Sequence, residues 1–176
     1  MKLLILAPLF PPDVGAGAGY AKRLSLLLAK QGHALTCLHY GELPETVPGV
    51  QFVSIKKDRS SLVRVGTFLI ALLTLRQADA FLVLNGQSVE LPIILARVFL
   101  KGKIIYLTHD PEAAKQPGLL KSFLRKQLLC QSLQIQVPET LLHPPLIHPL
   151  KPTAPETQTA YQTAWEEHVT ALKKLL

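Results

Sequence analysis

The sequence predicts an α/β fold: a doubly wound, mainly parallel Rossmann-like sheet of about six strands, with a C-terminal helix packed back on it. Two observations predict this class. Short aliphatic runs alternate with helical stretches, as they do when helices cover both faces of a parallel sheet. A separate amphipathic segment follows a proline-rich stretch at the C-terminus. The pattern predicts a domain at 1–150, a linker at 151–155 and a helix at 156–176.

The apolar runs and the stretches between them predict the individual elements. The expected strands are 3–7, 34–39, 50–55, 80–84, 103–107 and 133–137. The expected helices are 20–30, 62–76, 89–100, 119–131 and 156–176. No helix is expected in the turn-rich segment 41–49. After Val137, six prolines within eighteen residues exclude a helix or a central strand and predict an extended linker.

The composition excludes a disordered chain, because hydrophobic residues make up 48% and charged residues only 18%. The net charge of +7 lies wholly in residues 1–150, which fits an anionic partner such as phospholipid headgroups or nucleotide diphosphates. A merely soluble basic surface is the alternative, and we expect no nucleic-acid partner.

Cys37 and Cys130 lie in apolar runs without metal-ligand spacing, so each is expected to be a small buried hydrophobe in a reduced, cytoplasmic setting. No trio of histidines has metal-ligand spacing either, and we expect no metal. The apolar run 65–75 is far shorter than the ~20 residues that a membrane-spanning helix needs.

The segment between the first strand and the first helix contains three alternating glycines, Gly15, Gly17 and Gly19. Glycines permit positive φ and close backbone approach, and N–H groups at a helix N-terminus attract anions. The segment therefore predicts a phosphate site. Two alternatives stay open: a flexible turn without a ligand, and a dinucleotide fingerprint, although the spacing is not Gly-x-Gly-x-x-Gly.

The order of these features resembles the N-terminal domain of GT-B glycosyltransferases of family 4. The features are a strand at 3–7, Phe10-Pro11-Pro12, the glycines at 15–19, a helix at 20–30, Gly32-His33 and a second strand. Further matches are Asp79 before the fourth strand and Thr108-His109-Asp110 at the end of the fifth. Val137-Pro138-Glu139 stands where the family usually has a sixth strand that ends in Ser-Glu. The resemblance covers about residues 1–150.

This resemblance implies hexosyl transfer from a nucleotide sugar to an acceptor hydroxyl, with the acceptor on this domain and the donor on a second one. It implies that His109 is catalytic and that Gly15, Gly17, Gly19 and Asp110 contact the substrate or its phosphates. His109 could stabilise a sugar hydroxyl or a developing charge. A structural histidine at the end of a strand, followed by a turn at Asp110, is the alternative.

The donor site of that family is expected to be absent from these residues. No pair of glutamates has the Glu, seven residues, Glu spacing of the family's C-terminal domain. Residues 164–169, Ala-Trp-Glu-Glu-His-Val, resemble the last helix of full-length members, which packs back on the N-terminal domain. The expected partner is therefore a donor-binding domain or subunit, and the nucleotide sugar is a substrate rather than a cofactor.

Other interpretations of the whole chain also stay open. A non-catalytic Rossmann-like binding or scaffold module is the main alternative, and an NAD-type dehydrogenase domain is a third hypothesis. The C-terminal segment could equally be an unrelated amphipathic helix that covers the sheet.

Basic residues beside apolar helical stretches predict contact with an anionic membrane surface. The candidates are Arg64, ahead of the run 65–75, and Lys121, Arg125 and Lys126 within the expected helix 119–131. An ordinary sheet-covering helix with a basic outer face explains the same pattern.

Overall fold

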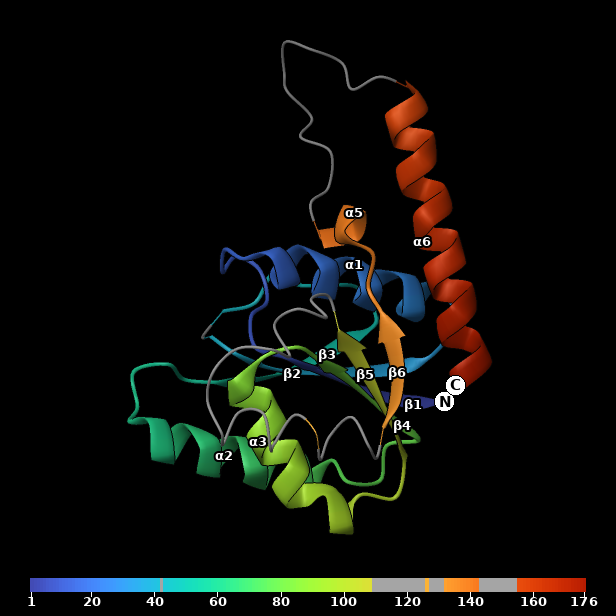
Figure 1. Cartoon of the computed structure of the whole chain (residues 1–176). Coiled ribbons are helices and arrows are strands. Elements are labelled where there is room, and N and C mark those ends of the chain that lie inside the picture. The colour runs from blue at the N-terminus through green and yellow to red at the C-terminus, as the bar shows by residue number, and fades with distance from the viewer. Residues whose placement is uncertain (42, 109–125, 127–131, 143–154) are drawn as a thin grey trace.

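A six-stranded, all-parallel sheet lies between two layers of helices (Figure 1), and the strand order is β3-β2-β1-β4-β5-β6. This computed structural model describes residues 1–41, 43–108, 126, 132–142 and 155–176. The predicted fold class is confirmed. The strands are β1 (Lys2–Ala7), β2 (Ala34–Tyr40), β3 (Val50–Ile55), β4 (Ala80–Leu84), β5 (Lys103–Thr108) and β6 (Leu133–Gln136).

The helices are divided between the two faces of the sheet. The helices α1 (Ala16–Lys30), α5 (Glu139–Leu142) and α6 (Pro155–Leu175) cover one face. The helix α2 (Ser61–Thr74), α3 (Gln87–Ala96) and the 3₁₀ turn η1 (Arg97–Phe99) lie on the other (Figure 1). Of the predicted helix 119–131, only Lys126 is among the described residues, so that prediction stays untested.

The strand β1 supplies both hydrophobic cores, because successive side chains of a strand point to opposite faces. Leu3 and Ile5 are fully buried against the α1 face, whereas Leu4 and Leu6 are fully buried against the α2 and α3 face. Cys37 is buried in the first core as expected, and burial raises the pKa of its thiol to about 12. The thiol is therefore an inert packing group.

Several predicted boundaries differ from the structure, and two of these differences affect the candidate site and the linker. The helix α1 begins at Ala16 and not at Tyr20, so Gly17 and Gly19 lie within its first turns. The segment after Val137 is not extended throughout, because it contains the short helix α5, whose Leu141 is buried in the core. Proline is tolerated just before a helix, since the first N–H groups of a helix have no partner within it. The density of prolines alone therefore predicted a longer extended segment than the structure contains.

The C-terminal helix α6 packs back on α1 through aromatic side chains. The Trp165 ring is buried and stacks on Tyr20, with ring centroids 5.3 Å apart and planes 19° apart. The Arg23 guanidinium lies over the Tyr161 ring at 4.6 Å and over the Trp165 ring at 5.3 Å. The Tyr20 hydroxyl and His168 Nε2 are 2.6 Å apart. This contact joins residues that are 148 positions apart in the sequence.

Replacing Trp165 with alanine should lower the free energy of unfolding by about 3 to 5 kcal/mol, because it removes the largest buried side chain of α6. Denaturant unfolding followed by circular dichroism measures this loss. Trp165→Phe should cost less, since it keeps a ring on Tyr20 and removes an indole N–H that has no hydrogen-bond partner among the described residues. Glu166→Ala, at an exposed position, is the control. An unchanged midpoint for Trp165→Ala would contradict the docking of α6.

Burial lowers the pKa of His168 to about 4, below the usual value of about 6.5. The unfolded chain therefore takes up this proton before the folded chain does. The neutral imidazole makes its full contribution to the free energy of unfolding above about pH 6.5. This contribution is lost as the pH falls towards 4. The difference in unfolding free energy between wild type and His168→Gln should shrink over this range. Urea titrations in buffers of different pH measure this difference. If the difference between the two proteins stays constant over this range, the prediction is refuted.

Candidate functional site

The topology places the candidate site at the carboxyl edge of the sheet, between β1 and β4. The strand order reverses there, since β1 pairs with β2 on one side and β4 on the other. Ligands of open α/β sheets bind at such a point, outside the carboxyl ends of the strands. The segments after β1 and β4 approach each other closely. A Cβ on Gly86 would lie 2.9 Å from the Pro8 ring, so this contact requires glycine.

The three glycines predicted to bind phosphate lie at the start of α1, on this edge. Gly15 precedes the helix with extended backbone, and a Cβ there would meet the Leu9 side chain at 2.8 Å. Gly17 and Gly19 are helical, and a Cβ on either would meet nothing within 4 Å. Neither positive φ nor lack of space therefore explains the glycines at 17 and 19, and their role in phosphate binding stays a prediction.

The backbone at the start of α1 is still consistent with the predicted anion site on electrostatic grounds. No side chain caps the N-terminus of α1, and its first turn contains no acidic residue. The first N–H groups of a helix have no partner within it and carry the positive end of the macrodipole. An anion at this position would therefore be bound by backbone N–H groups, as at other helix N-termini.

The N-terminus of α3, on the other face of the sheet, already has an internal anion. The Glu90 carboxylate is buried, and its Oε1 atom accepts a hydrogen bond from the Gly86 N–H at 3.3 Å. The Tyr106 hydroxyl donates to the same oxygen at 2.5 Å and lies 3.1 Å from Asn85 Oδ1. This network fixes the turn after β4. Of these two helix starts, only that of α1 has no acidic group of its own.

The charged side chains beside the N-terminus of α1 form pairs. Lys57 Nζ, after β3, lies 2.6 Å from Asp13 Oδ1, in the segment after β1. Lys22, on α1, forms an ion pair with Glu45 in the segment between β2 and β3. Each lysine is therefore neutralised by a carboxylate from another part of the chain. These pairs hold the segments around the carboxyl ends of β1, β2 and β3 together.

His39, near the end of β2, is a buried neutral side chain. Its Nδ1 atom lies 3.1 Å from the Tyr40 carbonyl oxygen, which can only accept, so Nδ1 carries the proton. Its Nε2 atom then accepts from the Ser54 hydroxyl at 2.9 Å. Burial lowers the pKa of His39, while the Tyr40 carbonyl and the Asp13 charge oppose this shift. The histidine joins β2 to β3, where the sheet has no connecting helix.

Sequence reasoning missed these partners. Asp13 stood within the quoted Phe-Pro-Pro-Asp segment, but Lys57 is 44 positions further on and belongs to no motif. The pairing of Ser54 with His39 depends on the register of two strands, which the sequence does not reveal. The alternation of polar residues near the strand ends was the only available signal.

Several predicted site residues lie outside the described part of the chain: His109, Asp110, Lys121 and Arg125. Of the other membrane candidates, Arg64 lies on α2, where its guanidinium donates to the Ser61 hydroxyl at 3.2 Å. Lys126 is helical and exposed. The roles of all these residues stay predictions.

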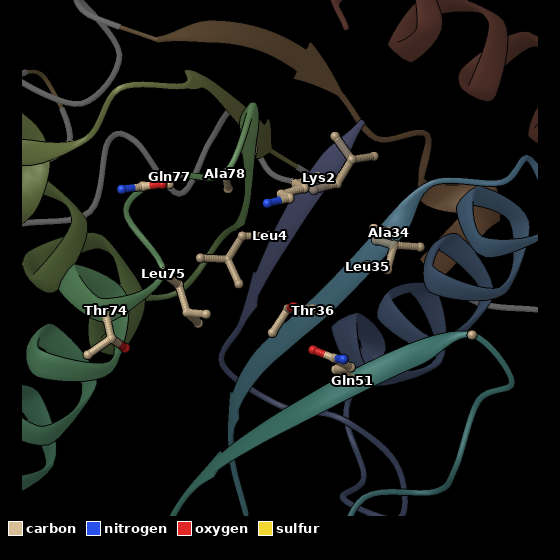
Figure 2. Close-up of a pocket in the computed structure, with 12 residues that line it drawn as sticks. Lys2, Leu4, Ala34, Leu35, Thr36, Gln51, Thr74, Leu75, Gln77 and Ala78 are labelled. Atoms are coloured by element: carbon tan, nitrogen blue, oxygen red, sulfur yellow. The ribbon is translucent and has the colours of Figure 1, made fainter.

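A cavity of about 510 Å³ lies at the opposite edge of the sheet, beside the amino ends of β1, β2 and β3 (Figure 2). Leu4, Thr36 and Gln51 are register partners across these strands and form its floor. Leu75 and Gln77, which follow α2, form a wall. The helix α2 ends here, and the floor becomes polar where no helix covers it. This groove lies away from the carboxyl edge, which remains the better candidate.

Within the described residues, no three histidine, cysteine, aspartate or glutamate side chains are grouped as a metal site. In the same part of the chain, no helix is long and apolar enough to cross a bilayer. No protein-family model and no curated protein matches the sequence. The likeness to glycosyltransferases therefore depends on the motifs quoted above.

Substitution of two glycines should have opposite effects. Gly17→Ala should raise the free energy of unfolding by about 0.5 to 1 kcal/mol, because Gly17 is helical with open space around its Cα. Gly41→Ala should lower it by about 1 kcal/mol or more, because Gly41 has a φ of 138° and its Cβ would lie 2.9 Å from Asp13 Oδ2. Thermal unfolding compares the variants. A destabilising Gly17→Ala would show that this glycine is needed for another reason.

Proposed function

We propose that the chain is the acceptor-side domain of a GT-B glycosyltransferase similar to family 4. The reaction is transfer of a hexosyl group from a nucleotide sugar to an acceptor hydroxyl. A second domain or subunit, which these 176 residues do not contain, binds the donor. The acceptor binds at the carboxyl edge of the sheet, next to the start of α1.

The contact between α6 and α1 is the observation that carries this proposal. The resemblance implies that the segment 164–169 belongs to a helix that returns to the N-terminal domain. In the structure, Trp165 and His168 from that segment pack on Tyr20 of α1. Two segments that resemble the family, one near each end of the chain, thus contact each other in the structure.

The carboxyl edge supports the proposal in a second way. The N-terminus of α1 has neither a cap nor an acidic residue in its first turn, so it suits the diphosphate of a donor or a charged acceptor. In the proposed enzyme, His109 follows the last residue of β5 and hydrogen-bonds the reacting sugar. The uncharged His39 and the paired lysines keep the surrounding segments in place.

A non-catalytic binding module is the second candidate, and one observation favours it. The described charged side chains around the start of α1 are paired with each other, Asp13 with Lys57 and Lys22 with Glu45. Such pairs stabilise the fold of the edge without leaving these charges for a substrate. A module of this kind would bind a partner and transfer nothing.

The isolated chain should transfer no sugar from a labelled nucleotide sugar, because the residues that hold the donor lie elsewhere. Mixing it with a donor-side GT-B domain that carries the two-glutamate motif should restore transfer. His109→Ala should then lower the rate about a hundredfold, the usual effect of losing one group that stabilises developing charge. Product formation on an acceptor panel measures both.

Two controls separate the hypotheses. Trp165→Phe, which keeps α6 docked, should leave the restored rate unchanged, whereas the donor-side domain alone should be inactive. Transfer by the isolated chain that His109→Ala abolishes would show that the donor site is present after all. Binding of donor-side domains without any transfer would favour the non-catalytic module.

A further inference from the structure

The outer surface of α2, α3 and η1, here called the α2–α3 face, has an unusual concentration of exposed apolar side chains. Ten large hydrophobic residues are exposed in the described part of the chain, and six of them lie on this face. Leu62 is 87% exposed and Val98 83%. The six residues are Leu62, Val63, Ile70, Leu95, Val98 and Phe99.

The helix α2 is apolar on its core side and uncharged along its solvent side. Phe68 and Leu72 are buried against the sheet. On the opposite side, exposed residues recur every three or four positions, and all are uncharged: Val63, Thr67, Ile70 and Thr74. A helix that covers a sheet in water normally has charged residues along this stripe. The composition of the outer stripe therefore indicates contact with something less polar than water.

Within the described part of the chain, carboxylates are scarce around this face. The helices α2 and α3 contain one acidic residue, Glu90, which is buried and bonded to Tyr106. The nearest exposed acids at the two ends are engaged: Asp58 lies 4.0 Å from Arg59, and Asp79 accepts a hydrogen bond from the Lys2 backbone at 2.7 Å.

Basic residues border the face at both ends. Lys56, Arg59 and Arg64 precede or begin α2, at the carboxyl edge of the sheet. Arg76 and Lys101 follow α2 and η1 at the amino edge, and the Lys101 N–H donates to the Arg76 carbonyl oxygen at 3.5 Å, which brings the two segments together. An uncharged centre with cationic ends is complementary to a surface that has negative charges outside an apolar interior.

We propose that the α2–α3 face docks on an anionic lipid membrane. The exposed apolar side chains enter the boundary between headgroups and acyl chains, and the basic residues contact lipid phosphates. The two helices lie side by side below the sheet in Figure 1, opposite to α1 and α6, so they form a layer that one planar surface can contact. The inference does not depend on glycosyl transfer, because the face is separate from the carboxyl-edge site.

Vesicle flotation with the full chain tests this docking. The protein should bind vesicles of phosphatidylcholine mixed with phosphatidylserine, bind those of phosphatidylcholine alone much more weakly, and dissociate as salt is added. Arg76→Glu combined with Lys101→Glu should weaken binding about tenfold or more. Lys173→Glu combined with Lys174→Glu, an equal change of exposed charge on α6, should have little effect.

The apolar contribution has its own pair of variants. Ile70→Ser combined with Val98→Ser should weaken binding to anionic vesicles about tenfold or more, because each side chain loses contact with the acyl region. Leu43→Ser, at a position 83% exposed outside this face, is the matched control. Equal binding by both variants would overturn the proposal. The proposal would also be overturned if the protein did not bind anionic vesicles but formed dimers that Val98→Ser dissociates. A second copy of the chain would then cover the face.

Discussion

The handedness of the connections between parallel strands determines how the rest of this structure is arranged. A strand, crossover, parallel-strand unit is almost always right-handed, so the direction of travel along the sheet decides which face a connection covers. The step from β1 to β2 puts α1 on one face, whereas the steps from β3 to β4 and from β4 to β5 put α2 and α3 on the other. None of the described crossover helices therefore covers the α1 face above β5 and β6. The helix α6 covers it with Trp165, Val169 and Leu172.

The central strands β1 and β4 were predictable because burial on both faces gives each of them a continuous apolar run. Val50–Ile55 and Ala80–Leu84 have the predicted bounds, and the other strands differ by one residue at one end. The errors arose where residue type is a poor guide to backbone conformation. Gly17 and Gly19 are helical despite a low helix propensity, and α5 follows directly after Pro138.

The candidate site was predictable in position but not in detail. A parallel sheet places its ligands at the carboxyl edge, so the segment after β1 was a sound choice. The pairs that organise that edge depend on contacts between distant parts of the chain. Asp13 meets Lys57 because the segments after β1 and β3 both lie at the carboxyl edge of the sheet, and Glu90 meets Tyr106 because α3 lies on the face of the sheet to which Tyr106 points. Neither partner is implied by local sequence.

The ends of the chain meet at the amino edge of the sheet (Figure 1). Asp79 accepts from the Lys2 N–H, and its carbonyl oxygen accepts from the Lys103 N–H. The Lys103 ammonium in turn donates to backbone oxygen atoms of Leu175 and Leu176. A chain whose ends are this close tolerates circular permutation, with α6 leading directly into β1.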